Sequence, residues 1–414
     1  MPSLKLLKTC SLIGALAIVL GQTGLWGQPL PERPGASRPL QLTKPRVEPL
    51  PEAQWTAEHK KRAAQFVPAA ARPRNSFRTL LNVPELVDHT MSFYRYVSQD
   101  TSLAPRIREL LMLRTAWLHG SDVLWRERVP HARQAGLGND LRRIAEGPSA
   151  AGWDPFEANL LRMADQLFRN SFVNNAVFKM VATRYNTCNL MDAGMTVADV
   201  ASLALLYNTL GVQPDEAPAA DRMPIDIAYK VDVPAREAVT LKVPRAEPMP
   251  GTGANNPRTF GLCPELAKAR NGSTYVNSIS MLGTTGRERD RELLILRIGW
   301  NSQSAYEWSE HVGRVGGARK MGLPIERITA GPNAPGWDPF EANLLRFADE
   351  MYRDSVVSER TWNALSQRYD KRLMIDATIT TANYRMISMA LNILGVQVNP
   401  GEETLPAVPA PAAQ

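Results

Sequence analysis

The sequence predicts an all-α protein built from two similar helical bundles that pack as a pseudo-two-fold pair. Nearly every periodic apolar segment has helical spacing, and strand-like alternation occurs only in a connector between the two halves. Segments of the first half also recur in the second half in the same order, with a period of about 184 residues. A repeat of that length is a domain, so we interpret the chain as a tandem duplication of one bundle.

Length and charge limit the function classes. The chain of 414 residues is long enough for two or three domains, and an apolar share of 44% suits a globular core. The net charge is +7, but Lys and Arg are scattered among Asp and Glu. No basic block is interleaved with aromatic residues, so we interpret the charge as a solvated surface and expect no nucleic-acid partner.

The first residues resemble a targeting segment. Two lysines precede an apolar run at 12–20, and small residues follow this run. That order is typical of a secretory signal peptide, here 1–27, and the run is too short to span a bilayer. We expect cleavage between Gly21 and Gln28, export to the periplasm or the medium, and no membrane contact afterwards. An uncleaved N-terminal anchor is the alternative.

Two cysteines, Cys188 and Cys263, remain after such a cleavage. Neither belongs to a Cys-x-x-Cys pair. An oxidising compartment permits a disulfide, but the two residues lie in different halves of the chain, and we favour independent core residues. A fold stapled mainly by disulfides is excluded by the number of cysteines.

The chain divides into six segments. Residues 28–74 form a Pro-rich tether with one helix, which Pro68 to Pro73 ends. After the signal peptide and this tether come the first domain at 75–213, a linker at 214–258, the second domain at 259–399 and a disordered tail at 400–414. The linker holds two strand-like runs, Ile225–Val233 and Ala238–Val243, which suggest a small hairpin.

Helical spacing predicts the elements of the first domain. We expect helices at 84–96, 104–117, 125–135, 174–185 and 197–210. Another helix should begin after Asp154, because a capping acid directly before Pro155 is a helix-start signal. The ten residues from Trp153 to Arg162 recur without a difference at 337–346, which supports the duplication and predicts the same helix in the second domain.

The second domain carries the residues that suggest chemistry. Glu292 lies on one predicted helix, and Ser304, Glu307 and His311 lie on the next at positions i, i+3 and i+7, which share one helix face. A carboxylate beside an imidazole orients the ring and raises its pKa, which suits proton transfer.

This pattern resembles the carboxymuconolactone decarboxylase family, which includes the AhpD-like alkylhydroperoxidases. Peroxidase members carry a Glu, a Cys-x-x-Cys twelve residues later and a His four residues after that. Here Ser304 and Glu307 stand at the two cysteine positions, and the Tyr306-Glu307-Trp308 form resembles the non-redox members. The resemblance covers both domains and implies two AhpD-like bundles. Thiol chemistry of the AhpD type needs both sulfurs, so a peroxiredoxin activity, although common as a family-level label, is the least favoured reading.

The resemblance implies a cofactor-free lyase or isomerase that moves a proton on a small carboxylated lactone or keto acid. His311, Glu307 and Glu292 are the expected catalytic residues. Ser304, Tyr306, Trp308 and Arg297 are the expected substrate-binding residues. The family also builds rings of subunits, which implies a homo-oligomer, here a trimer of tandem chains.

Several alternatives stay open. The Glu–His pair could be a surface pair on a helix, or His311 with two Glu could hold a metal, although no His or Cys cluster supports a metal site. Arg297 and the equivalent Arg114 could pair with acids inside the bundles instead of binding a substrate carboxylate. The whole chain could be a non-catalytic ligand-binding or assembly module with the same fold.

The first domain lacks the same chemistry. The positions that match the site are Glu109, Ser121, Leu124 and Arg128, so the second acid and the histidine are missing. We therefore expect the first domain to be a structural partner of the second.

Overall fold

The computed structural model describes most of the chain, in the ranges 34–35, 37–231, 233–234, 241–271, 279–284 and 286–406. The predicted signal peptide and the last eight residues of the predicted tail lie outside these ranges. Every regular element in the described residues is a helix, which confirms the all-α class.

The first half contains nine α-helices in its described residues. They are α1 (Ala57–Phe66), α2 (Asn75–Leu80), α3 (Pro84–Arg95), α4 (Pro105–Leu118), α5 (Asp122–Gln134), α6 (Leu141–Glu146), α7 (Pro155–Asn170), α8 (Asn175–Ala182) and α9 (Thr187–Leu210). Short helical turns of other types lie at Glu52–Gln54, Tyr96–Asp100 and Ala219–Asp221.

The described residues of the second half contain a similar series. They form α10 (Asn255–Phe260), α11 (Pro264–Asn271), α13 (Met281–Thr284), α14 (Glu288–Asn301), α15 (Ala305–Val312), α16 (Ile325–Ala330), α17 (Pro339–Asp354), α18 (Glu359–Ser366) and α19 (Lys371–Leu394). Six pairs have identical lengths. The pairs α2/α10 and α6/α16 have 6 residues in each helix, α8/α18 have 8, α4/α14 have 14, α7/α17 have 16, and α9/α19 have 24.

The predicted helix starts at α7 and α17 are confirmed. The Asp154 carboxylate accepts a hydrogen bond from the backbone N–H of Phe156 at 2.6 Å, and Asp338 accepts one from Phe340 at 2.9 Å. The carboxylate satisfies an N–H that has no partner within the helix. One predicted start is wrong, because α9 begins at Thr187 instead of 197. Its first turn is polar and starts from a capping box at Asn186, a local signal that apolar periodicity does not register.

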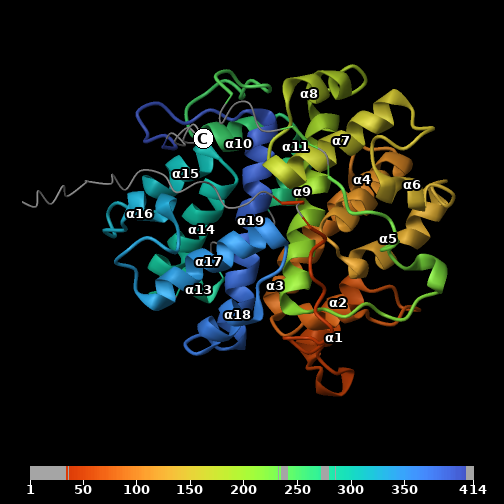
Figure 1. Ribbon diagram of the computed structural model, residues 1–414, viewed down its shortest axis with the longest axis horizontal. Coiled ribbons are helices and arrows are strands. Elements are labelled where there is room, and N and C mark those ends of the chain that lie inside the picture. Colours follow the sequence, from red (N-terminus) through yellow and green to blue (C-terminus); the bar gives the residue numbers. More distant parts are fainter. Residues whose placement is uncertain are drawn as a thin grey trace, which may run out of the picture.

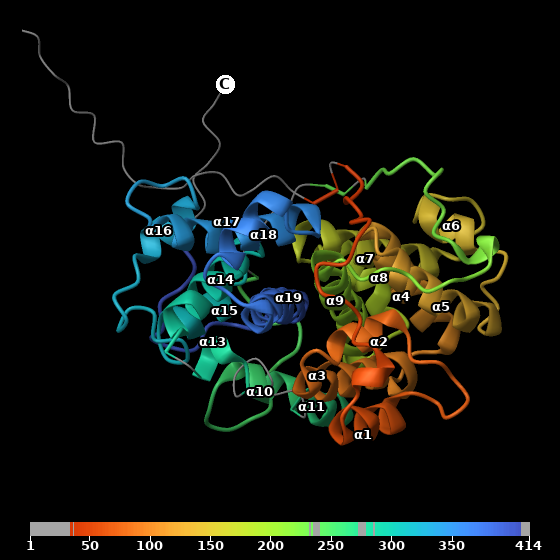
Figure 2. The same ribbon diagram turned by 90° about the horizontal axis from the view of Figure 1, so that it is seen from below.

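The two long helices, α9 and α19, form the centre of the molecule. They lie side by side, and the other helices of each half lie on their outer sides (Figures 1 and 2). In the described residues, α9 is long and apolar enough to cross a membrane, but its most apolar 18-residue window is entirely buried inside the protein. Its apolar surface therefore serves as core.

Two asparagines at the ends of these helices reach across to the other half. Asn208 of α9 donates a hydrogen bond to the carbonyl of Ser355 at 3.3 Å, and Asn392 of α19 donates one to the carbonyl of Ser171 at 2.9 Å. Both serines have left-handed backbone, with φ of 48° at Ser171 and 59° at Ser355, where α7 and α17 end. The contacts are reciprocal, so each half completes the other.

A short arm packs against each half. An arm with the pattern Pro-Arg-x-Glu-Pro precedes each half, at 45–49 and at 244–248. The N–H of Arg46 donates to the carbonyl of Leu210 at 2.9 Å, and the N–H of Arg245 donates to Leu394 at 2.8 Å. Part of the predicted tether and part of the predicted linker therefore belong to the two packed halves.

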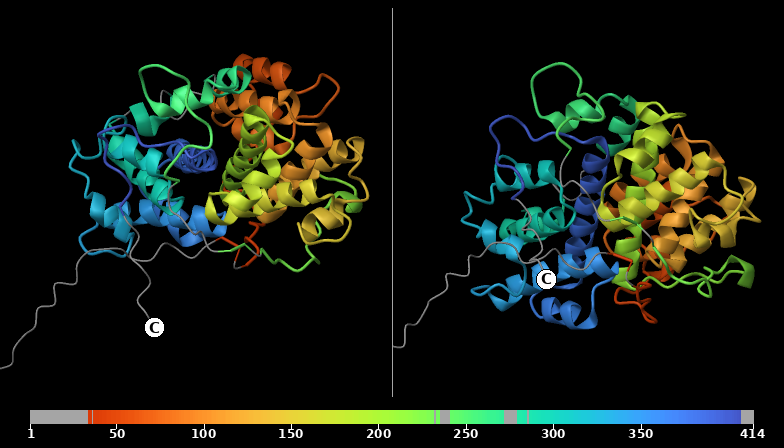
Figure 3. Two further views of the ribbon diagram at one scale, coloured as in Figure 1. Left: turned by 90° about the horizontal axis from the view of Figure 1, so that it is seen from above. Right: turned by 45° about the horizontal axis from the view of Figure 1, so that its top comes forward.

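Each arm also contacts the opposite half. The Arg46 guanidinium carbon lies 4.8 Å from the ring centre of Trp362 on α18, and that of Arg245 lies 4.3 Å from the ring centre of Phe178 on α8. Cation–π contacts of this kind contribute roughly 0.5–2 kcal/mol each. Each arm therefore connects the two halves. Both views of Figure 3 show the central helices between the two groups of outer helices.

The described residues of the linker form no strand. Ile225–Val231, where a strand was predicted, crosses the surface of the first half through individual contacts. The Tyr229 hydroxyl donates to the carbonyl of Leu118 at 2.5 Å, and Arg38 donates to the carbonyl of Ile227 at 3.0 Å. The alternating residues meet no neighbouring strand, so a hairpin does not form there.

The prediction of two independent cysteines is wrong. Cys188, in the first turn of α9, forms a disulfide with Cys263, which directly precedes α11. The pair is 75 residues apart in the sequence and joins the two halves. Sequence separation argued against this pair, but packing of the halves brings the start of α9 beside the start of α11.

We expect the disulfide to stabilise the folded chain. Replacing both cysteines by serine should lower the free energy of unfolding by about 2–4 kcal/mol, because the cross-link restricts the unfolded chain. Urea unfolding followed by circular dichroism measures the difference. A reductant should destabilise the wild type to the same degree and leave the double variant unchanged. Equal stability of the two proteins without reductant would contradict this role.

Candidate active site in the second half

The candidate site lies where α14 and α15 pack against each other. The two helices are joined by a turn at 302–304, in which Gln303 has a φ of 50°. The N–H of Ser304 donates to the carbonyl of Gly299 at 3.0 Å, which folds α15 back along α14. This antiparallel arrangement brings the end of α15 beside the beginning of α14.

His311 lies between two carboxylates. Its Nδ1 is 2.7 Å from Glu292 Oε2, and its Nε2 is 3.0 Å from Glu307 Oε1. All three side chains are buried, with Glu292 fully inaccessible and His311 3% exposed. The structure therefore brings together the three predicted catalytic residues, and the reading of His311 and Glu307 as an exposed surface pair is wrong.

Three neighbours hold this arrangement in place. Arg291 Nη2 lies 2.9 Å from Glu292 Oε1, the oxygen that His311 does not use. The ring of Tyr384, from α19, packs edge-on against the imidazole with ring centres 4.9 Å apart. Gly316 passes so close that a Cβ there would lie 2.1 Å from Glu292 Oε2. Only glycine leaves space for the carboxylate.

The pKa values follow from this geometry. Burial lowers the pKa of His311, but the charges and hydrogen bonds of Glu292 and Glu307 outweigh burial and raise the pKa to about 10. Burial raises the pKa of Glu292, but His311 and Arg291 outweigh this effect and hold it below its usual range. At neutral pH the imidazole is therefore cationic and the Glu292 carboxyl is ionised.

The other predicted residues lie around this core. Ser304 stands at the N-cap position of α15 and is fully buried, but its side chain makes no capping hydrogen bond. Trp308 packs against Trp300 with ring centres 5.9 Å apart. The Tyr306 hydroxyl accepts a hydrogen bond from the N–H of Asn256 at 3.3 Å. In this structure Ser304 and Trp308 serve packing, and Tyr306 connects α15 to α10.

Arg297 is paired inside the bundle. Its Nε and Nη2 donate to the two oxygens of Asp349 at 2.6 and 3.0 Å, and its Nη1 donates to the carbonyls of Ile328 and Thr329, both at 2.9 Å. Arg114 makes the same bidentate pair with Asp165 at 2.7 and 2.9 Å. The geometry supports the structural alternative for both arginines.

The first half has a different pair at the matching place. Arg128 donates from Nε to Glu109 Oε2 at 2.9 Å and from Nη2 to Oε1. Arg128 therefore occupies the position of His311 against the equivalent acid, as the alignment predicted. Arginine does not release its proton in proteins, so this pair has no acid–base chemistry at neutral pH. His131 is exposed and lies outside the pair.

Sequence reasoning missed Arg270, at the end of α11. Its Nη1 donates to the side-chain oxygen of Asn256 at 3.2 Å, and its guanidinium carbon lies 4.2 Å from the Phe260 ring centre. Burial lowers the pKa of Arg270, and the charge of Glu307 acts against this shift. Arg270 pairs with no acid among the described residues, and no spacing in the sequence links it to Glu307.

Within the described ranges, no group of three or more His, Cys, Asp or Glu side chains is arranged to hold a metal ion. Comparisons with protein-family models, with curated proteins and with solved structures found no match to this chain.

We expect His311 to remain an imidazolium well above neutral pH. A folded-state pKa of about 10 lies above the ordinary value of 6.5. The stability that this group contributes is therefore complete below about pH 6.5 and is lost as the pH rises through about 10. Glu292→Gln removes one of the two carboxylates and should lower this pKa. Nuclear magnetic resonance of the ring carbons, titrated from pH 5 to 11, measures both values.

The signal of His311 is assigned by its loss in a His311→Gln variant. His131→Gln is the matched control, because this exposed residue lies outside the Glu109–Arg128 pair. A wild-type His311 that titrates near its ordinary value would contradict the proposed charge state.

Proposed function

We propose that the second half is a cofactor-free acid–base site of the carboxymuconolactone decarboxylase type. Its substrate would be a small carboxylated lactone or keto acid. The observation that carries the proposal is the buried His311 with a carboxylate on each ring nitrogen. Perturbed titratable groups that meet on rigid helices are a frequent property of catalytic sites.

The protonation state of His311 decides which residue can act as the base. Because His311 is already protonated at neutral pH, we assign the role of base to Glu307 rather than to the imidazole. The second oxygen of Glu307 accepts no hydrogen bond from the described residues, so this oxygen is the one offered to a substrate. His311 orients Glu307 and exchanges protons with it. Glu292 holds the opposite ring nitrogen, and Arg291 holds the Glu292 carboxylate.

The proposed step balances without a cofactor. In isomerisation, Glu307 takes a proton from the carbon beside a carbonyl, the C–H electron pair forms an enolate, and the proton returns to another carbon. In decarboxylation, the bond to the leaving CO₂ breaks and its electron pair forms the enolate. His311 then passes its proton through Glu307 to the carbon, and the imidazole regains a proton from water. The nearby charge of His311 favours the anionic intermediate in both cases.

Arg270 is the candidate for binding the substrate carboxylate. It is the cation near Glu307 that lacks an acidic partner among the described residues, and its single described hydrogen bond goes to an amide oxygen. A guanidinium can bind a carboxylate through two parallel hydrogen bonds. Arg297 cannot take this role while Asp349 and two carbonyls hold its guanidinium.

One observation favours a non-catalytic module as a second candidate. The Glu109–Arg128 pair joins α4 to α5 without any acid–base chemistry, and the buried network of Glu292 and His311 joins α14 to α15 in the same way. A purely structural network would serve a ligand-binding or assembly module equally well. Thiol peroxidase activity stays the least favoured function, since Ser304 and Glu307 occupy the positions of the two sulfurs.

Activity measurements separate the two candidates. His311→Gln and Glu307→Gln should each lower kcat by at least about 100-fold on a panel of lactones and β-keto acids, because proton transfer contributes about 10²–10⁴. Arg270→Gln should raise KM with a smaller effect on kcat. His131→Gln is the control, and circular dichroism verifies the fold of each variant. Unchanged turnover in His311→Gln would reject the catalytic function and leave the structural one.

We also propose that the chain is exported. The disulfide between Cys188 and Cys263 supports this proposal, because such bonds persist mainly in oxidising compartments. Sequencing the N-terminus of the protein from the periplasmic fraction or the medium should find a start between Gly21 and Gln28. Protein that begins at Met1 and is confined to the cytosol would contradict export.

A further inference from the structure

A cleft of about 600 Å³ opens in the first half, between the start of α5, the start of α6 and linker residues 219–226. These helices lie on the side of the first half that faces away from the second half (Figure 1). The volume lies within the range of about 300–1,000 Å³ that is usual for small-molecule sites. The cleft is therefore large enough for a ligand and separate from His311.

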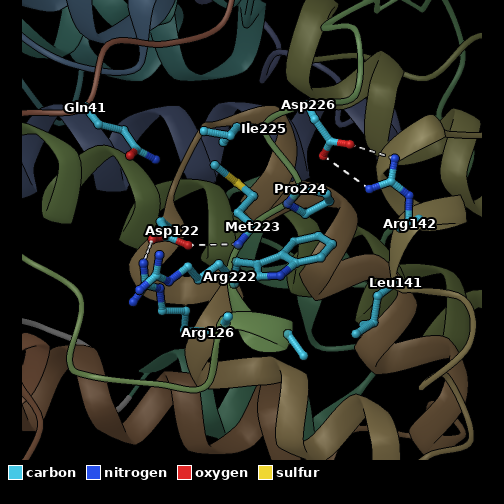
Figure 4. A pocket seen from close by; sticks show the side chains of 13 residues that line it. Gln41, Asp122, Arg126, Leu141, Arg142, Arg222, Met223, Pro224, Ile225 and Asp226 are labelled. Carbon is cyan, nitrogen blue, oxygen red and sulfur yellow. Dashed lines mark hydrogen bonds and ion pairs between the residues drawn. The ribbon is translucent and has the colours of Figure 1, made fainter.

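The charges around the cleft do not cancel. Three arginines line it, together with two acids. Arg126 pairs with Asp122, and Arg142 pairs with Asp226 at 2.8 and 3.2 Å, as the dashed lines in Figure 4 show. Arg222 pairs with no acid in the described part of the chain. One positive charge is left over, so the cleft favours an anion.

The second half indicates what kind of anion fits. Trp125 and Arg126, which line the cleft, correspond to Trp308 and Ser309 of α15. There the chain supplies its own carboxylate, because Glu402 Oε2 accepts a hydrogen bond from the Ser309 hydroxyl at 3.1 Å. Proline stands at the position of the first half that corresponds to Glu402. Asp122 is the carboxylate on this face of α5, and Arg126 and the N–H of Met223 already bind it, so no second carboxylate stands at the position of Glu402.

Apolar side chains complete the cleft. Leu141, Met223 and Ile225 add apolar surface, and Ile225 is 69% exposed. A ligand with an acidic group and a compact apolar body matches both kinds of surface.

We propose that this cleft binds a small organic carboxylate and that Arg222 holds its acidic group. The site is additional to the one proposed around His311 and does not depend on it. Arg142 and Asp226 flank the entrance as an exposed ion pair, with 62% and 64% of their side chains accessible.

Calorimetric titration of the full chain with benzoate tests the proposal. Benzoate should bind saturably, and its neutral analogue benzamide should bind at least about tenfold more weakly, because a charged hydrogen bond is lost. Arg222→Ala should weaken benzoate binding by a similar factor. Arg360→Ala, an exposed arginine on α18 in the other half, is the matched control and should leave the affinity unchanged.

Two further measurements locate the bound benzoate. A bulky side chain in Met223→Trp should abolish binding by filling the cleft, and His311→Gln should have no effect. The proposal is overturned if benzoate and benzamide bind alike, if neither binds, or if Arg222→Ala and Arg360→Ala give the same affinity. Loss of binding in His311→Gln would place benzoate at the other site and would also overturn it.

Discussion

The contact between α9 and α19 is the constraint on which the rest of the structure depends. Each helix has 24 residues, and almost all of their side chains are buried. Each of these helices is covered on nearly all sides, and part of the cover comes from the other half, so neither half is complete alone. Arg385 of α19 shows the same dependence, because its guanidinium donates to the carbonyl of Tyr352 at 3.2 Å and across the interface to that of Phe168 at 2.9 Å. The arms and the disulfide strengthen this junction.

The central helices also determine where chemistry can occur. Tyr384 of α19 packs against the imidazole of His311, so the candidate site is supported by the same helix that joins the halves. The equivalent acids Glu109 and Glu292 both bind a cation from the following helix. With Arg128 the cation is permanent, whereas with His311 it can exchange a proton. Two differences in residue type, Leu124 against Glu307 and Arg128 against His311, separate a structural ion pair from a candidate acid–base site.

The helices could be predicted from the sequence because the signals that form and start a helix are local. Apolar spacing and the caps at Asp154 and Asp338 depend on residues a few positions apart, so the all-α class and the start of α7 could be predicted. The triad of Glu292, Glu307 and His311 was also predictable, since two members share one helix turn and the third lies on the adjoining helix. The strand predicted from Ile225 did not form in its described residues, because alternation specifies a strand only when another strand lies beside it. Residues 238–240 of the second predicted strand lie outside the described residues.

The sequence by itself therefore determined the helical class, and it singled out the three residues that the structure brings together in the candidate site. Tertiary structure alone decided the disulfide, the contacts of each arm with the opposite half, the position of Arg270 and the pairing of Arg297 with Asp349. Each of these depends on segments that are distant in the sequence and adjacent in space. The charge of His311 belongs to the same group, because two carboxylates from different helices must be buried beside one ring before its pKa rises to about 10.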